Sequence, residues 1–299
     1  MSGWSDLKSP VPTTAGEPAK QSRSKEDLFK KPEEITRGLK VALAGDEDVG
    51  KSYTALSFPP PIYVINTEPL GIIRIVHHFP GKDINIFDAF VIDPNTDQPD
   101  PIASIDAIDE AIRALRDLKE GTIVLDSATH LWQWVQSWLN EQQVKRTKSG
   151  TILQFEYAIA FDKYRAMVLR LLARPTHFVM TSQMRDVYDA RGQSTGGREP
   201  RWFGETPHQV DCWWLMEKAT TVLGQNQPSV IKYRATLQRE RWQRMRKVYT
   251  VEDLTYEKII KTLNEGLGIP LEILGVNNNG AGDSKDTNGD NSGVQEDSS

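Results

Sequence analysis

Residues 45–52 of the chain, GDEDVGKS, combine residue types and a spacing that suit the binding of phosphate. Gly45, Gly50, Lys51 and Ser52 fit G-x-x-x-x-G-K-[ST], in which glycines let the backbone wrap around an anion and successive N–H groups point inward. The lysine of such a loop reaches the outer phosphates of a nucleotide, and the hydroxyl ligates Mg²⁺. We predict a nucleotide-binding loop made of the following residues: Gly45, Asp46, Glu47, Asp48, Val49, Gly50, Lys51, Ser52 and Tyr53.

Three carboxylates in this loop, at positions 46–48, are unexpected where an anion binds. They do not exclude the site, because such a loop binds phosphate through its backbone, and the side chains can project into water. Their charge is expected to weaken nucleotide affinity by repulsion, an effect that salt screens.

Three further polar residues follow apolar runs that are typical of buried strands. Asp126 ends TIVLD, where a carboxylate can hold Mg²⁺ opposite Ser52. Glu68 follows IYVIN and can act as the general base for an attacking water. Gln183 follows HFVMTS, and its amide can sense the γ-phosphate. The alternatives are a helix N-cap for Asp126, a solvated loop side chain for Glu68, and an ordinary polar strand end for Gln183.

Strands and helices alternate along the chain in a way that places these residues at one edge of a sheet. Four short apolar runs predict buried strands at 39–45, 62–66, 121–127 and 176–182. Helices are predicted at 51–58, 103–118, 155–173 and 254–266, and later strands at 210–217 and 229–238. This order predicts an α/β fold, a mostly parallel sheet with helices on both faces and antiparallel C-terminal strands. Ligands of such sheets bind at the carboxyl ends of the strands.

Length and composition limit the kind of protein. The chain has 299 residues, a formal net charge of −5 and a single cysteine, Cys212, which excludes an intrachain disulfide. We predict a cytoplasmic protein with no membrane partner, because no apolar run reaches 18 residues. Polar composition predicts a disordered arm at 1–36 and a disordered acidic tail at 276–299, on either side of one domain at 37–275.

Together these motifs resemble the RecA/RadA family of recombinases. The resemblance rests on the phosphate loop, Glu68, Asp126–Ser127 and Gln183, and it covers roughly residues 38–240. More narrowly, the compact core is similar to RecA-like (AAA-type) nucleotide-binding proteins of phages and archaeal mobile elements, some of which act in single-strand annealing. Asp48 departs from the small residue usual at its position. The resemblance implies a RecA-like P-loop ATPase core, ATP and Mg²⁺ as cofactors, and a homo-oligomeric ring or filament with nucleotide between subunits.

Residues 184–206 follow Gln183 and are expected to form a long, glycine-containing loop that binds single-stranded DNA. Arginines can pair with phosphates and aromatic rings can stack on bases. The DNA-binding candidates are Arg185, Arg191, Arg198, Arg201 and Trp202.

The stretch 231–250 is the most basic in the chain. One interpretation is a track for the phosphate backbone of DNA. Another is that Lys232 or Arg234 reaches the nucleotide of a neighbouring subunit as a trans-acting cation. A third is a strand edge protected by charge.

We therefore predict an Mg²⁺-ATP-dependent, RecA-like DNA-binding ATPase that acts in DNA recombination, single-strand annealing or repair. Glu68, Lys51 and Gln183 are the predicted catalytic residues, and Gln183 couples the nucleotide to residues 184–206. One alternative is a hexameric helicase or DNA-packaging motor on the same fold. The other is a nucleotide-dependent protein adaptor with little hydrolysis.

Overall fold

The computed structural model describes residues 29, 31, 37–69, 71–146, 156–189, 191–221 and 230–276. The chain divides into two compact units, Met1–Thr36 and Arg37–Ser299, and the second contains every helix and strand named below. The predicted arm at 1–36 and the predicted tail at 276–299 lie almost wholly outside the described residues, so these boundaries stay predictions. Among the described helices, none combines the length and the apolar character needed to cross a bilayer.

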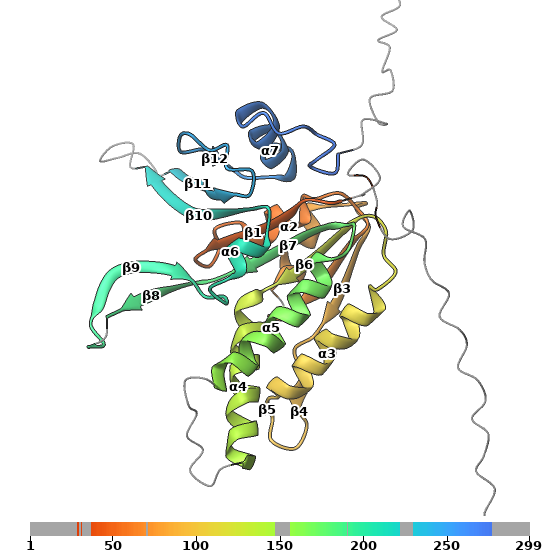
Figure 1. Ribbon diagram of the computed structural model, residues 1–299, viewed down its shortest axis with the longest axis vertical. Coiled ribbons are helices and arrows are strands. Elements are labelled where there is room, and N and C mark those ends of the chain that lie inside the picture. Colours follow the sequence, from red (N-terminus) through yellow and green to blue (C-terminus); the bar gives the residue numbers. More distant parts are fainter. Residues whose placement is uncertain are drawn as a thin grey trace, which may run out of the picture. The chain divides into compact units, whose positions relative to one another are not determined.

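An eight-stranded sheet forms the centre of the second unit (Figure 1). The strand order is β12-β11-β10-β1-β7-β6-β2-β3. Each pair from β10 to β3 in this order is parallel, whereas β11 is antiparallel to both β10 and β12. The strands are β1 Lys40–Gly45, β2 Ile62–Asn66, β3 Ile84–Asp88, β6 Thr122–Asp126, β7 His177–Ser182, β10 Cys212–Thr221, β11 Val230–Glu240 and β12 Thr250–Glu252. The predicted α/β fold class, a mostly parallel sheet with helices on both faces and antiparallel C-terminal strands, is confirmed.

Helices cover both faces of this sheet, which is why β1 and β7 are buried at every position. One core joins Ala42, Ile123 and Phe178 to three helices, α3 Pro101–Ala114, α4 Ala128–Arg146 and α5 Tyr157–Leu172. The other joins Val41 and Leu43 to α2 Lys51–Leu56, η2 Ile72–His78, α7 Tyr256–Lys261 and the π-helical turn η4 Thr262–Gly266. Alternate residues of β1 therefore serve opposite cores, as the two-residue period of a strand requires.

Helix α3 begins two residues before its predicted start. Asp100 is its N-cap, and its carboxylate accepts hydrogen bonds from the N–H groups of Ile102 and Ala103 at 3.0 and 2.9 Å. Pro101 follows at the first helical position, where no N–H is needed. Apolar periodicity alone did not include this polar cap, so the helix start was predicted late.

The segment after Gln183 is a β-hairpin, not the predicted loop. Strand β8 (Met184–Tyr188) pairs antiparallel with β9 (Ser194–Pro200), and Gly192, with φ of 75°, lies in the turn. In Figure 1 the hairpin extends away from the sheet. Its strands combine Gly and charged residues with little apolar alternation, so strand propensity gave no signal for it. Strand β3 and the short pair β4 (Ile92–Asp93) and β5 (Gln98–Pro99) also went unpredicted.

Candidate nucleotide-binding site

The phosphate loop connects β1 to α2, the structural context that the sequence pattern requires. Gly50 has φ of 90° and Asp48 has φ of 54°, both in the left-handed region that glycine, and among other residues aspartate and asparagine, tolerate best. At Gly45 a Cβ would lie 2.4 Å from the carbonyl oxygen of Met216 on β10. Only glycine therefore fits at the start of this loop.

The tips of three parallel strands meet the loop at one pocket. Glu68 follows β2, Asp126 ends β6 and Gln183 follows β7, and all three line a pocket of about 900 Å³ together with residues 47–54. These strands lie next to one another in the sheet, which brings residues far apart in sequence to the same edge. The pocket is large enough for a nucleotide.

Ser52 and Asp126 form the pair that could hold Mg²⁺. The Ser52 hydroxyl donates to Asp126 Oδ2 at 2.8 Å, and the Thr181 hydroxyl donates to Oδ1. Asp126 is 3% exposed, and burial raises the pKa of its carboxyl group although both hydroxyls oppose this. Oxygen ligands beside a buried carboxylate suit Mg²⁺. Within the described residues no three His, Cys, Asp or Glu side chains gather as a metal site, so phosphate oxygens and water would complete the coordination.

Lys51 is folded back onto the loop that it follows. Its Nζ donates to the carbonyl oxygens of Gly45 and Asp46 at 3.0 and 2.5 Å. Burial lowers the pKa of Lys51, while Asp126 and Glu68 act in the opposite direction. A phosphate in the loop would supply the negative charge that this partly desolvated ammonium group lacks.

Glu68 is held by groups from two other strand ends. Its Oε1 accepts a hydrogen bond from the Ser127 hydroxyl at 3.1 Å and another from Gln183 Nε2 at 3.2 Å. The side chain is 30% exposed, so it keeps a face toward the pocket. A carboxylate fixed in this way is suited to orient a water molecule.

The three loop carboxylates, at positions 46–48, are exposed, and two of them have partners. Asp46 accepts two hydrogen bonds from the Arg198 guanidinium, at 2.5 and 2.6 Å, and this interaction lowers the pKa of its carboxyl group. Asp48 lies 3.8 Å from Lys218 Nζ. Arg198 belongs to β9, so the hairpin is attached directly to the phosphate loop.

The predicted DNA-binding residues differ in their surroundings. Arg185 donates to Glu199 across the hairpin, at 2.7 and 2.9 Å, and Arg191 is exposed near the turn. Arg201 is exposed and its guanidinium faces the side-chain amide of Gln133 on α4.

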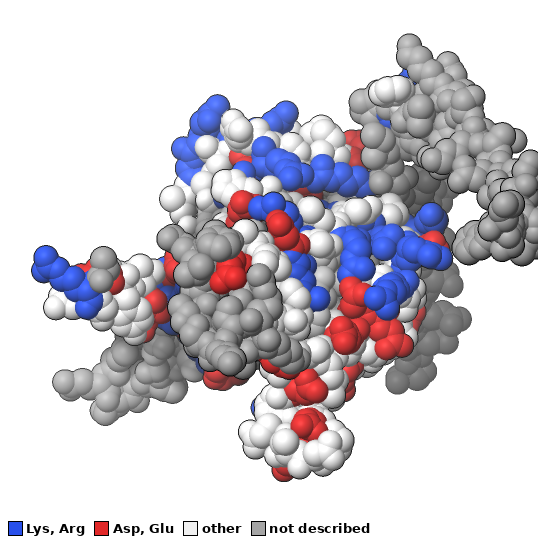
Figure 2. All heavy atoms as spheres, turned by 60° about the horizontal axis from the view of Figure 1, so that its bottom comes forward, with Lys and Arg blue, Asp and Glu red and all other residues white. Residues whose placement is uncertain are grey.

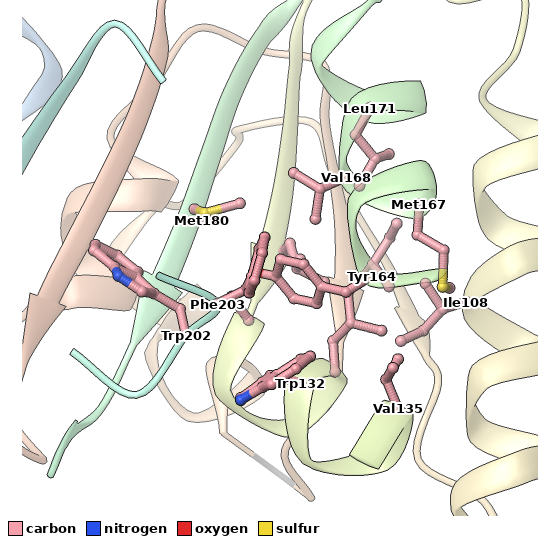
Figure 3. Close-up of a cluster of buried hydrophobic side chains, with 14 of the residues drawn as sticks. Ile108, Trp132, Val135, Tyr164, Met167, Val168, Leu171, Met180, Trp202 and Phe203 are labelled. Carbon is pink, nitrogen blue, oxygen red and sulfur yellow. The ribbon is translucent and has the colours of Figure 1, made fainter. Parts of the chain in front are cut away.

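Trp202 requires a correction, because the structure buries it. Its side chain is 5% exposed and packs edge-to-face on Trp213, with ring centroids 5.7 Å apart. Figure 3 shows Trp202 and the neighbouring Phe203 among the core residues. A buried ring offers no stacking surface to a base, so Trp202 is part of the hydrophobic core. Its aromatic character alone could not distinguish these two roles.

The trans-acting candidates lie on β11. Lys232 donates to Glu252 of β12 at 3.1 and 3.2 Å. Arg234 is exposed and lies opposite Glu217 and Glu252 in the strand register. Tyr233, between them, faces the opposite side of the strand and lines the pocket.

Comparison with known proteins agrees with this geometry. A model of the AAA_24 family, described as an AAA domain, matches residues 37–210, more than half of the chain. The chain belongs to the AAA_24 family of AAA domains. The match covers the phosphate loop, Glu68, Asp126, Gln183 and the hairpin, and it assigns the chain to the P-loop ATPases. Comparison with curated proteins finds no match.

Two solved structures are similar to this AAA domain at low sequence identity. The RadB recombinase is 13% identical, with a TM-score of 0.41, over 72% of this chain and 87% of the recombinase. An ATPase from the type III secretion system of pathogenic bacteria is 14% identical, with a TM-score of 0.39, over 60% of this chain. The match spans 52%, about half, of that second protein.

Some residues that line the pocket or lie beside it were not identified from the sequence. Arg74 of η2 and Tyr233 of β11 line the pocket. His130 of α4 lies next to Glu68, with Nδ1 and Oε1 3.6 Å apart. The sequence offered a weak signal only for His130, which comes four residues after Asp126 and lies in the first turn of α4.

Proposed function

We propose that the chain is an Mg²⁺-ATP-dependent ATPase that binds single-stranded DNA and acts in recombination, single-strand annealing or repair. The observation that carries this proposal is the position of Gln183. Its side chain donates to Glu68, and its main chain continues into β8 and accepts a hydrogen bond from the Arg201 N–H at 2.7 Å. A change beside the γ-phosphate can therefore reach both ends of the hairpin through one residue.

Each part of the pocket has a separate role in this proposal. The backbone N–H groups of residues 45–52 bind the phosphates, and Lys51 neutralises part of their charge. Ser52 and Asp126 would hold Mg²⁺, which would supply further positive charge to the phosphate oxygens. Glu68 orients the attacking water and accepts its proton.

The hairpin is the proposed DNA-binding element. Residues 184–201 contain four arginines and three acids (Asp186, Asp189 and Glu199), which gives a net charge of +1. Arg185, Arg201 and the 60% exposed Tyr188 line a second hollow, of about 530 Å³. Figure 2 shows basic atoms at the outer end of the projecting hairpin. Guanidinium groups beside an exposed ring suit unstacked bases and phosphates.

Assembly and location complete the proposal. We propose a homo-oligomer, a ring or a filament, with nucleotide between subunits. The exposed Lys232 and Arg234 on β11 then remain candidates for contact with a neighbouring nucleotide. We place the chain in the cytoplasm, because its single cysteine, Cys212, is a buried thiol.

A protein adaptor with little hydrolysis is the second candidate, favoured by the pairing of hairpin arginines with acids. Arg185 is engaged by Glu199 and Arg198 by Asp46, which leaves less free charge for DNA. The ATPase rate with and without single-stranded DNA separates the two. Stimulation supports the DNA-dependent enzyme, whereas a slow rate that DNA leaves unchanged supports the adaptor.

Substitution of Lys51 tests the nucleotide site itself. Lys51→Ala is expected to abolish ATP hydrolysis while circular dichroism shows a folded protein, because the loop loses its phosphate-binding cation. Lys261→Ala, which removes an exposed lysine 71% accessible to solvent, is the matched control. Full activity in Lys51→Ala would contradict the assignment of this site.

A further inference from the structure

His130 lies at the start of α4, beside the carboxylate proposed as general base. Its Nδ1 is 3.4 Å from the Thr67 hydroxyl, 3.4 Å from the Ser127 hydroxyl and 3.6 Å from Glu68 Oε1. The ring stacks on Trp134, with centroids 6.2 Å apart and planes inclined by 26°. Trp134 is itself buried, so packing fixes the plane of the imidazole ring and directs one nitrogen toward three oxygens.

The hydrogens of the two hydroxyl groups are directed to other acceptors. The Thr67 hydroxyl donates to the carbonyl oxygen of Ser127 at 3.1 Å and accepts from the Ser127 N–H at 2.6 Å. The Ser127 hydroxyl donates to Glu68 Oε1. An ionised Glu68 can only accept. In this arrangement each oxygen presents a lone pair to His130, which assigns the shared hydrogen to Nδ1.

This conclusion holds for both charge states of the ring. A neutral imidazole carries one N–H, which the three acceptors place on Nδ1, and an imidazolium carries N–H on both nitrogens. Burial lowers the pKa of His130 and Arg201 acts in the same direction, against Glu68 and Asp126. The neutral ring with Nδ1–H is thus the form expected at neutral pH.

We propose that His130 is a positioning residue for ATP hydrolysis, which holds Glu68 in its water-orienting pose through an Nδ1–H donated to the Thr67 and Ser127 hydroxyls. This inference rests on the proposed function, because His130 can affect the rate of ATP hydrolysis only if Glu68 is the general base. The Nδ1–H of His130 occupies a lone pair of the Ser127 hydroxyl oxygen and thereby keeps the hydroxyl hydrogen directed at Glu68. Without the Nδ1–H, the Ser127 hydroxyl loses this constraint. The carboxylate then keeps only the bond from Gln183.

The number of bonds between Cβ and the side-chain nitrogen suggests two variants that separate a donor at Nδ1 from a donor at Nε2. In Asn the amide nitrogen is two bonds from Cβ, like Nδ1 of histidine, whereas in Gln it is three bonds away, like Nε2. His130→Asn keeps a donor where Nδ1 lies, and His130→Gln moves it to the far side of the ring. Ser137→Ala, at an exposed position of the same helix, is the control for changes in α4.

The kinetic test compares these full-length variants with the wild-type protein. We expect His130→Ala and His130→Gln to lower kcat by about 10- to 100-fold, because a catalytic group displaced by about 1 Å loses such factors. KM for ATP should change by less than about twofold, and His130→Asn should recover most of kcat. The inference is overturned if kcat is unchanged in His130→Ala, or if kcat falls equally in His130→Asn and His130→Gln. If His130→Ala does not fold, the Asn and Gln pair still decides.

The tautomer gives a readout that needs no activity. Long-range ¹H–¹⁵N spectra of the ¹⁵N-labelled protein at neutral pH distinguish Nδ1–H from Nε2–H, and the spectrum of His130→Asn assigns the signal among the 5 histidines. Nδ1–H is expected, and Nε2–H overturns the inference. If the wild-type protein hydrolyses no ATP, the proposed function is contradicted. The tautomer spectrum still tests, without any activity, whether His130 carries its hydrogen on Nδ1.

Discussion

At the scale of single residues, the polar side chains at the strand ends form a site because they hydrogen-bond to residues that are distant in sequence. Glu68 is bonded to Ser127, 59 residues away, and to Gln183, 115 residues away. Residue types and positions predicted each of the three strand-end groups, but not the bonds between them. Those bonds decide that Glu68 is held rather than solvated.

Replacement of Glu68 by Gln tests its role as base. The amide keeps nearly the same shape but cannot take a proton, so we expect kcat to fall by about 10²- to 10⁴-fold. Binding of a fluorescent ATP analogue should persist, since Glu68 is not among the loop groups that hold phosphate. Glu257→Gln, an exposed carboxylate on α7, is the control. A kcat within about twofold of wild type would show that another group orients the water.

At the scale of elements, the β8–β9 hairpin links the proposed DNA surface to the phosphate loop. Gln183 leads into β8, and Arg198 of β9 binds Asp46 in the loop. Arg198 is also 3.3 Å from Asp186 on the facing strand. An acidic phosphate loop, unexpected for anion binding, thus has a structural reason: Asp46 anchors a basic hairpin.

Asp46 and a DNA phosphate should compete for Arg198. Asp46→Ala is expected to raise the affinity for single-stranded DNA by up to about fivefold, because the guanidinium loses its carboxylate partner. Arg198→Ala should lower this affinity, and the double variant should match Arg198→Ala. Fluorescence anisotropy with labelled single-stranded DNA and ATP at fixed salt measures all three.

Asp48→Ala is the matched control for that prediction. It removes the same charge from the same loop, but Asp48 is near Lys218 and not the hairpin. If Asp48→Ala raises the affinity for single-stranded DNA as much as Asp46→Ala does, the gain comes from the reduced negative charge of the loop. The contact between Asp46 and Arg198 is then not its cause.

At the scale of the whole molecule, buried polar groups join the strand starts opposite the pocket. His177 of β7 is 7% exposed, and its Nδ1 accepts the Leu39 N–H at 3.1 Å. Lys40 of β1 donates to the carbonyl oxygens of Arg174 and Thr176, at 2.7 and 2.5 Å. Burial, and then the Lys40 charge, lower the pKa of His177 to about 4.

This shift makes stability depend on pH. Between the ordinary value of 6.5 and about 4, the unfolded chain binds a proton at His177 that the folded protein does not. Acidification through this window therefore favours unfolding, by about 2 kcal/mol between pH 7 and pH 5. Urea unfolding at the two pH values should show this loss in the wild type and a smaller one in His177→Gln. His208→Gln, at an exposed position, is the control, and equal losses in all three proteins would contradict the assignment.

The sequence by itself determined the phosphate loop, the four central strands and the three polar residues at their ends. These features are local. The apolar run of a buried strand and the glycines of a tight anion-binding turn each lie within a few consecutive residues. Tertiary structure decided the rest. Trp202 became core rather than DNA surface, residues 184–200 became a hairpin, and His130 came to lie beside Glu68. Burial and pairing depend on chain segments that only folding brings together, so no local pattern could encode them.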